Sequence, residues 1–385
     1  MMRFRRGFPL SVLVGALSRL AFAGAEPAVQ RVTFPSPLPS GVERNDRVIC
    51  WYFRPEGDGP FPGVLVLHGL GSRKAKNERK LALRLSREGM AALVMTLPYH
   101  IGRRKKGRHA WTAFLGREPE GFRRSMEQAV ADARACLSWL EQRPEVDGGR
   151  LGVVGVSLGG ILATIVSGLD PRVKALVIIV GGGRFGLIVR KSLLLVPYKL
   201  GLVRGRIGGV KEALSGLDPV DLAPRIVKRK VAVLMVEAER DEIIPPGSWR
   251  TLWEALGRPA LLLLPGGHFS AWLNRGMVMR EVVGFLRRCL VEGKPYRMGV
   301  SRLPGASASV GAVLDPERGL LPAFFLKPPW REWPLKVLPE VSVTTHGLYI
   351  GLSSGLTSPL HLGLMARALP SEWRPRFALS FRLEL

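Results

Sequence analysis

Short apolar runs alternate with longer amphipathic segments over residues 47–292. Runs such as VLVL (64–67), AALVMTL (91–97) and LGVVGV (151–156) have the length and apolar character of strands buried on both faces. Residues 121–143 instead repeat their apolar side chains at helical spacing, which indicates an amphipathic helix. This alternation predicts an α/β fold in which helices cover both faces of a mostly parallel, doubly wound sheet.

The alternation continues further along the chain and is interrupted once. We expect a helix from Leu158 to about Leu169. Three more strands and a final amphipathic helix are expected at 173–180, 231–236, 261–264 and about 272–290. Between residues 181 and 230 a basic and apolar insertion interrupts the alternation of strands and helices. This insertion is either a lid over the carboxyl edge of the sheet or a set of packed connecting helices.

After residue 294 the helical periodicity is lost, and proline and glycine become frequent. The segments 342–354, 360–369 and 376–385 alternate apolar with polar or small residues, as half-exposed antiparallel strands do. We therefore predict an α/β domain over residues 26–294 and a small β-rich extension over residues 295–385.

The first 25 residues have the features of a signal peptide. Three arginines precede an apolar stretch, and AFAGA offers small residues for cleavage. The pair Arg5-Arg6 before Gly-Phe-Pro-Leu also fits a twin-arginine export signal. Arg19 interrupts the apolar run, so a short interfacial anchor helix is the alternative. We expect an exported protein that is periplasmic, secreted or associated with the cell envelope.

The formal net charge is +26, which favours anionic partners such as membrane headgroups or cell-wall polymers. The basic residues are spread along the chain, with one dense run at 102–108. The alternative is that the basic residues bind no particular partner and reflect the composition of the source genome or a heat-adapted surface. No helix-turn-helix, zinc-finger or RNP-like pattern accompanies the charge, so specific nucleic-acid binding is not expected.

The cysteines are scarce and lack the spacing of a metal site. Cys50, Cys136 and Cys289 each stand in an apolar context, which predicts buried free thiols rather than a disulfide framework. The sequence also contains no Walker loop and no dinucleotide-binding glycine pattern. We therefore expect neither a metal nor another cofactor.

One hydroxyl stands in the segment GVSLG (155–159), where a strand-like run meets a helix-like one. This fits the pattern G-x-S-x-G, in which a strained turn lifts the serine above the sheet edge. Ser157 would then lie at the start of a helix, whose dipole favours developing negative charge. The alternative is a serine that only caps the helix.

A serine becomes a useful nucleophile when a base accepts its proton and an acid orients that base. His268 stands in LLLLPGGHFS, on a glycine-rich loop after the last strand-like run. Asp241 follows the strand-like run VAVLMV. The order Ser157, Asp241, His268 is the order of one fold that carries the G-x-S-x-G turn, so we predict these three as catalytic residues.

Residues 47–292 resemble the alpha/beta hydrolase superfamily, and are similar to its dienelactone hydrolase and prolyl-oligopeptidase-like branches. The resemblance rests on GVSLG, on LDPVDLAP (217–224) before the acid strand, and on HGLG (68–71) after a strand. It implies the alpha/beta-hydrolase fold and a serine hydrolase activity that needs no cofactor.

The resemblance also implies an oxyanion hole, formed by the backbone N–H groups of Leu70 and Leu158. One position departs from the pattern, because the glycine that commonly opens the acid loop is Ala238 here. This departure leaves Glu239 and Glu242 as weaker candidates for the acid.

Further polar residues follow the strand predicted at 91–97. In LPYHIGRR, we expect Tyr99, His100 and Arg103 to line the substrate pocket, with Arg103 meeting an anionic group. His68 is interpreted as a residue that stabilises the HGLG turn rather than as a second base.

The function expected from the sequence is hydrolysis of a small-molecule or lipid carboxylic ester through an acyl-enzyme. The alternatives are a peptidase or acyltransferase of the same fold, and a non-catalytic binding protein for anionic lipid or cell-wall polymer.

Overall fold

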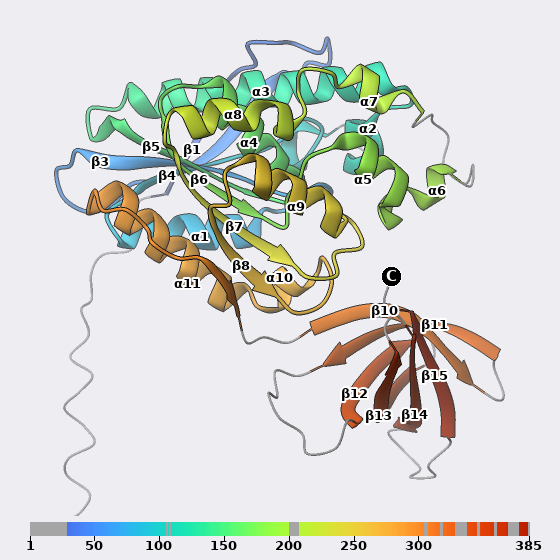
Figure 1. The fold of residues 1–385 in the computed structure, drawn as a ribbon. Coiled ribbons are helices and arrows are strands. Elements are labelled where there is room, and N and C mark those ends of the chain that lie inside the picture. The colour runs from blue at the N-terminus through green and yellow to red at the C-terminus, as the bar shows by residue number, and fades with distance from the viewer. Residues whose placement is uncertain are drawn as a thin grey trace, which may run out of the picture.

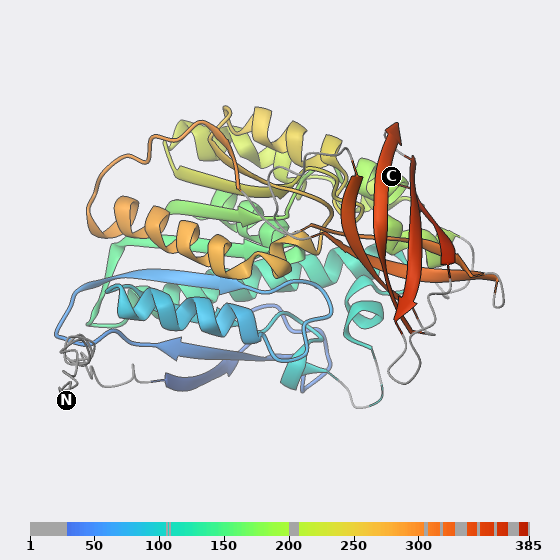
Figure 2. The same cartoon turned by 90° about the horizontal axis from the view of Figure 1, so that it is seen from below.

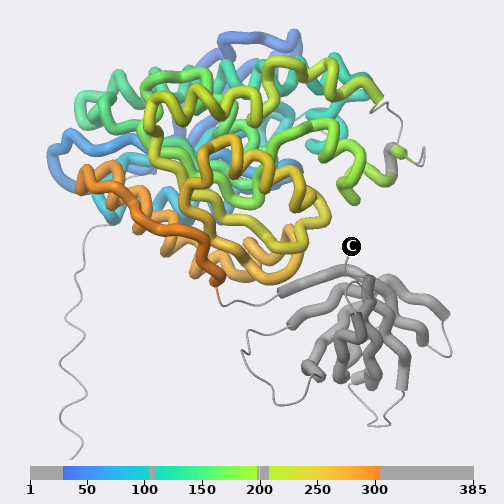
Figure 3. The backbone as a smooth tube through the Cα atoms, in the orientation of Figure 1, coloured from blue at the N-terminus to red at the C-terminus, as the bar shows by residue number. Residues whose placement is uncertain are grey.

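The computed structural model describes residues 29–104, 107, 109–199 and 208–303 (Figure 3). It also describes the backbone of six strands between residues 307 and 383 (Figure 1). The export signal expected over residues 1–25 lies outside these described residues. Within the described part of the chain, no helix combines the length and apolar character that crossing a bilayer requires.

Nine strands form the main sheet, in the order β1-β2-β4-β3-β5-β6-β7-β8-β9 (Figure 1). β2 is antiparallel to β1 and to β4, and every other neighbouring pair is parallel. The strands span Val29–Pro35 (β1), Arg47–Phe53 (β2), Phe61–Leu67 (β3), Ala91–Met95 (β4), Val146–Val156 (β5), Val173–Ile179 (β6), Ala232–Ala238 (β7), Ala260–Leu264 (β8) and Val300–Arg302 (β9). The mostly parallel sheet predicted from the sequence is confirmed.

The central strands are buried on both faces. Successive side chains of β3 alternate between two apolar clusters: Leu65 and Leu67 belong to one, and Val64 and Val66 to the other. Because neither face meets water, apolar residues occupy both sets of positions, and the strand has a continuous apolar sequence. This is why the apolar runs located the central strands.

Helices cover the two faces of the sheet (Figures 1 and 2). One face carries α3 (Pro119–Glu141), α4 (Leu158–Leu169) and α8 (Pro219–Lys228), whereas α1 (Lys76–Arg87) and α11 (Arg275–Leu286) lie side by side on the other. The other helical segments outside the insertion are η1 (Ile101–Arg103), α2 (Ala110–Leu115), α9 (Pro246–Ala255), α10 (Ser270–Leu273) and the π-helical turn η3 (Arg287–Val291). The single helix expected over 272–290 is therefore three consecutive segments.

The described part of the insertion at 181–230 consists of short helices that pack on the body of the protein. Before α8 they are α5 (Phe185–Lys191), η2 (Leu193–Leu195), α6 (Val196–Lys199) and α7 (Val210–Ala213). Phe185, Val210 and Leu214 belong to the same buried cluster as α3 and α4. These segments are therefore packed connecting helices, and α5 and η2 also cover part of the carboxyl edge of the sheet beside Ser157.

Beyond the main sheet, the chain forms the β-rich extension that was predicted. Its six strands are antiparallel and form a closed sheet, because β10 pairs with both β11 and β15. They span Ser307–Asp315 (β10), Gly319–Lys327 (β11), Val337–Thr344 (β12), Gly347–Thr357 (β13), Leu360–Ala368 (β14) and Phe377–Leu383 (β15). The domain boundary placed at residue 294 is too early, because β9 pairs with β8 inside the main sheet.

The cysteines are free, as the sequence predicted. Cys50 on β2 and Cys136 on α3 are both buried, and their sulfur atoms lie 3.6 Å apart. Cys289 is only partly buried, so the prediction of a buried thiol is wrong for this residue.

Candidate active site

Ser157 occupies the turn between β5 and α4. Its backbone has φ 54° and ψ −118°, a conformation that few residues other than glycine adopt. A Cβ at position 155 would overlap the carbonyl of Gly159, and a Cβ at position 159 would overlap the carbonyl oxygens of Leu67 and His68. The two flanking glycines are therefore required by space, and the turn holds the serine at the carboxyl edge of the sheet.

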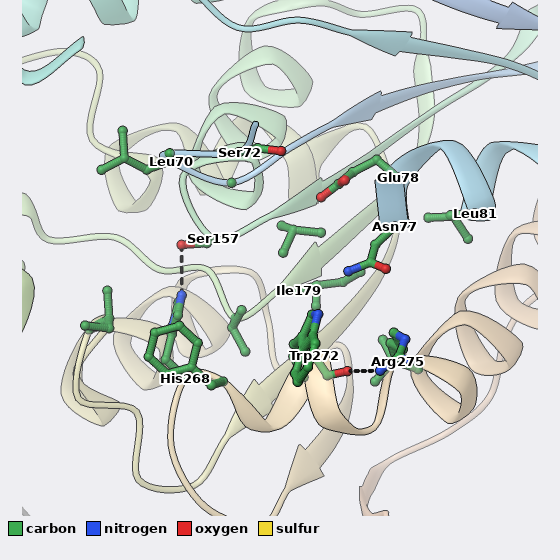
Figure 4. A pocket seen from close by; sticks show the side chains of 18 of the residues that line it. Leu70, Ser72, Asn77, Glu78, Leu81, Ser157, Ile179, His268, Trp272 and Arg275 are labelled. Atoms are coloured by element: carbon green, nitrogen blue, oxygen red, sulfur yellow. Dashed lines mark hydrogen bonds between the residues drawn. The ribbon is translucent and has the colours of Figure 1, made fainter. Parts of the chain in front are cut away.

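His268 lies on the loop between β8 and α10, and it contacts both of the other side chains predicted as catalytic. Figure 4 shows its ring directed at Ser157. Its Nε2 is 3.0 Å from Ser157 Oγ, and its Nδ1 is 2.8 Å from Asp241 Oδ2. Both distances are within hydrogen-bond range. The fold thus brings together in one hydrogen-bonded line three side chains that are far apart in the sequence.

Asp241 lies on the loop after β7 and is held by the backbone that follows it. The side chain is buried, and its Oδ1 accepts hydrogen bonds from the N–H groups of Ile243, at 2.9 Å, and Ile244, at 2.7 Å. Oδ2 remains available for the imidazole of His268. These two backbone donors fix the carboxylate in the orientation that the imidazole requires.

The two acids that were weaker candidates make other contacts. Glu239 accepts a hydrogen bond from Arg302 Nε at 2.7 Å. The Oε2 of Glu242 accepts the backbone N–H of His268 at 2.9 Å rather than a proton of the ring. Among the described residues, Asp241 is therefore the carboxylate that hydrogen-bonds the imidazole of His268.

Glu242 joins three segments around the histidine. Besides its side-chain contact with the His268 backbone, its carbonyl oxygen accepts the N–H of Leu193 in η2 at 2.9 Å. A Cβ at Gly267 would overlap the Glu242 carboxylate, so the glycine makes room for this contact. Burial raises the pKa of the Glu242 carboxyl above its usual value. The residue therefore ties the acid loop, the histidine loop and η2 together.

Glu237 is a buried acid that the sequence analysis did not single out. It lies at the end of β7, has no exposed surface, and accepts the N–H of Gly181 through Oε1 at 3.3 Å. Burial, and then the nearby charge of Asp241, raise the pKa of this carboxyl well above its usual value. The signal available in the sequence was one glutamate inside the otherwise apolar run VAVLMVEA.

The backbone donors expected to form an oxyanion hole are available. Leu70 and Leu158 both lie beside Ser157, along the wall of one cavity. Neither of their N–H groups donates a hydrogen bond to another described residue. The Leu158 N–H is also the first of α4, where the helix dipole adds partial positive charge.

His100 does not line the substrate pocket, so that expectation is wrong. Its ring is buried, Nε2 accepts the N–H of Gly71 at 2.9 Å, and Nδ1 donates to the carbonyl of Pro98 at 2.8 Å. His68 is buried beside it, and its Nε2 accepts the N–H of Leu97 at 3.1 Å. Burial lowers the pKa of His100 to about 4 and that of His68 to about 3. Both imidazoles are therefore neutral and stabilise the HGLG turn.

Arg103 does not line the pocket either, and its predicted role toward an anionic substrate is wrong. The guanidinium has no exposed surface and forms an ion pair with the buried Asp132 at 2.7 Å. It also donates to the carbonyl oxygens of Asn45 and Thr96. Tyr99 lines a separate polar cavity, and its N–H donates to the side chain of Asn45 at 2.7 Å. These residues build a buried polar network instead.

Two cavities meet at Ser157. The larger has a volume of about 540 Å³ and lies between the HGLG turn, α1, α10 and α11. Figure 4 shows Ser157 and His268 on one side of it, with Glu78 and Trp272 further along. The smaller has a volume of about 80 Å³ and lies under α5 and η2. Apolar side chains line most of both.

The site can activate a hydroxyl nucleophile and stabilise an oxyanion. It offers an oriented imidazole within reach of Ser157 and backbone donors beside the same serine. Among the described side chains, no three of His, Cys, Asp and Glu converge as metal ligands.

Comparison with known proteins shows distant relatives. The chain is 26% identical over 231 residues to the uncharacterized protein Rv2627c of Mycobacterium tuberculosis, which covers 56% of this chain and 52% of that protein. It is 27% identical over 201 residues to acyl-coenzyme A thioesterase 3 of Mus musculus, covering 52% of this chain and 41% of the relative. The chain thus spans about half the length of these two relatives or less.

The structural comparison shows the fold. The acylaminoacyl peptidase of Pyrococcus horikoshii superposes with a TM-score of 0.55 at 16% identity, covering 72% of this chain and 43% of the peptidase. Residues 50–259 match the model of the dienelactone hydrolase family, which is more than half of the 385 residues. The chain therefore belongs to the dienelactone hydrolase family and has the alpha/beta-hydrolase fold.

Proposed function

We propose that this protein is a serine esterase in which Ser157 is the nucleophile, His268 the general base and Asp241 the residue that orients the imidazole. The observation that carries the proposal is the hydrogen-bonded line from Ser157 Oγ through both ring nitrogens of His268 to Asp241. Such a line is what a serine needs in order to lose its proton during attack.

In the acylation step, Ser157 Oγ bonds to the ester carbon while its proton passes to His268 Nε2. The carbonyl oxygen becomes an oxyanion beside the N–H groups of Leu70 and Leu158. Each such preorganised donor is worth roughly 3–4 kcal/mol to the transition state. His268 then gives the proton to the leaving alkoxide as the carbon–oxygen bond breaks, which leaves an acyl-enzyme and a free alcohol.

In the deacylation step, water replaces the alcohol. His268 removes one proton from the water as its oxygen attacks the acyl carbon, and the same proton returns to Ser157 Oγ when the acid leaves. Asp241 stabilises the imidazolium that forms twice in the cycle.

Covalent labelling combined with turnover tests this proposal. Fluorophosphonate should label the wild-type protein on Ser157, and p-nitrophenyl butanoate should be hydrolysed. Ser157→Ala should lose both properties, whereas Ser192→Ala, which removes a nearby cavity hydroxyl, should still be labelled. Asp241→Asn should lower kcat by about 10⁴-fold, because the imidazole is then held in the wrong tautomer. Unchanged turnover in Ser157→Ala would refute the nucleophile.

A second candidate is hydrolysis of an acyl thioester, which the name of the mouse relative suggests. The chemistry of the line from Ser157 to Asp241 is the same, because only the leaving atom changes from oxygen to sulfur. Comparing butanoyl-coenzyme A with ethyl butanoate as substrates distinguishes the two. A kcat/KM that is at least tenfold higher for the thioester would favour the second candidate.

Export and binding to anionic surfaces are proposals that rest on the sequence. Residues 1–25 support export, and the net charge of +26 supports attraction to anionic lipid or cell-wall polymer. Expression in a secreting host followed by mass measurement of the mature N-terminus tests the first. Cosedimentation with anionic vesicles over a salt series tests the second, because screening should weaken the attraction.

A further inference from the structure

The nucleophile stands between two apolar spaces of unequal size. Ser157 and Leu70 line both the large cavity and the small one, as do Leu194 and Ile243. An ester that reacts at Ser157 carries one substituent on the carbonyl carbon and another on the ester oxygen. Each cavity can therefore take one of these two substituents.

The position of His268 decides which substituent enters which cavity. His268 lines the large cavity and is not part of the small one. Because this residue must protonate the leaving oxygen, the alcohol has to lie on its side of Ser157. The acyl chain then extends the other way, past Leu158, which lines the small cavity only.

The small cavity limits the length of the acyl chain. Its volume is about 80 Å³, and a water molecule has a share of about 30 Å³ in the liquid, so roughly three non-hydrogen atoms fit. Among its described lining residues, Ser157 and Ser192 are the only polar ones. The Ser192 hydroxyl already accepts the N–H of Leu194 at 3.3 Å. The space therefore suits a short hydrocarbon chain.

The large cavity suits a bulkier group. Its volume of about 540 Å³ is several times greater, and its lining includes Leu81, Met279 and Val282 from α1 and α11. Asn77 and Glu78, in the first turn of α1, are among its few polar side chains. This space can hold a large, mainly apolar alcohol.

We propose that the site selects esters that join a short acyl group of two to four carbons to a larger, mainly apolar alcohol. The inference rests on the proposed esterase function and adds the substrate class. It follows from two observations: the unequal volumes, and the presence of His268 beside the larger one.

Two ester series test the inference in the full-length protein. With p-nitrophenyl esters, kcat/KM should rise about fourfold for each methylene from ethanoyl to butanoyl, because each added group is buried. It should then fall at least tenfold at octanoyl, because the longer chain overfills the cavity. With butanoate esters followed by proton release, octyl butanoate should exceed ethyl butanoate in kcat/KM.

A matched pair of variants tests which cavity holds the acyl chain. Ile188, on α5, lines only the small cavity and is partly buried, so Ile188→Ala opens that space by three carbons. The acyl optimum should move from butanoyl to hexanoyl or octanoyl. Met279→Ala opens the large cavity instead and should leave the acyl optimum at butanoyl. Val189→Ala, in the small cavity, replaces Ile188→Ala if that variant does not fold.

The outcomes separate this inference from the proposed function. If no ester is hydrolysed, or Ser157→Ala remains active, the esterase proposal fails and the inference fails with it. If esters are hydrolysed but octanoyl is the best acyl group in the wild type, only the inference is refuted. The same holds if Met279→Ala moves the acyl optimum and the small-cavity variant does not.

Discussion

Gly267→Ala is expected to impair the site by displacing the carboxylate of Glu242. The backbone of Gly267 lies outside the left-handed region, so alanine is compatible with its conformation. The added methyl group would overlap the Glu242 side chain, whose flexible end can rotate away. Rotation breaks the 2.9 Å hydrogen bond from the His268 backbone N–H to Glu242 Oε2.

The expected loss of activity follows from the hydrogen bond between the His268 backbone N–H and Glu242. A hydrogen bond to a charged group contributes about 1.5–3 kcal/mol, which corresponds to a factor of about 12–150 in rate if the histidine loop moves. We therefore expect Gly267→Ala and Glu242→Ala each to lower kcat/KM by about 10- to 100-fold. The double variant should be no worse than either single one, because both remove the same contact.

Steady-state kinetics on one soluble ester measures kcat/KM for the wild type, the two single variants and the double variant. Circular dichroism verifies that each variant is folded. Glu242→Gln keeps an acceptor oxygen and should lose less than about tenfold. Glu239→Ala is the matched control, because that acid pairs with the exposed Arg302 and should change kcat/KM little. If the fold-losses of kcat/KM in the two single variants multiply in the double variant, Gly267→Ala does not act by displacing the Glu242 carboxylate.

Three further predictions concern the framework around the site. Arg103→Met should destabilise the protein by about 3–5 kcal/mol in urea unfolding, because it leaves the buried Asp132 without its cation, while Arg287→Met at the exposed ion pair with Glu88 should cost less than about 1 kcal/mol. Equal costs would contradict the structural role of Arg103. Burial lowers the pKa of His100 from 6.5 to about 4, so the unfolded chain binds the extra proton first, and the contribution of His100 to stability should fall by about 3 kcal/mol as the pH drops from 6.5 to 4, with a similar contribution from His68. His100→Gln should flatten that part of the stability curve, and an unchanged slope would exclude His100 as its cause. Gly155→Ala should abolish fluorophosphonate labelling, because its Cβ overlaps the carbonyl at the turn, and labelling at the wild-type rate would contradict the elbow geometry.

The local pattern of the sequence was enough to locate the central strands and the main helices. Runs such as LGVVGV are apolar at every position because both faces of the strand are buried. The edge strands β1 and β9 were not predicted, because β1 is mostly exposed and β9 has only three residues. Their place in the sheet depends on pairing with β2 and β8, which neighbouring residues do not encode.

The candidate site was predicted in part. GVSLG marked the turn because only glycine leaves room for the carbonyl groups packed at positions 155 and 159, and this requirement is local. The motif order then pointed to Asp241 and His268. Tyr99, His100 and Arg103 were misassigned, because a polar residue after a strand can face either a pocket or the interior.

The sequence by itself determined the fold class and the strained turn at the serine, since apolar periodicity and glycine placement are properties of short segments. Only the tertiary structure decided that Glu242 binds the His268 backbone, that Arg103 is buried against Asp132, and that His268 lies beside the larger cavity. These facts depend on which segments meet across the sheet. Contacts between distant segments are set by long-range packing, which cannot be predicted from the sequence of any one segment.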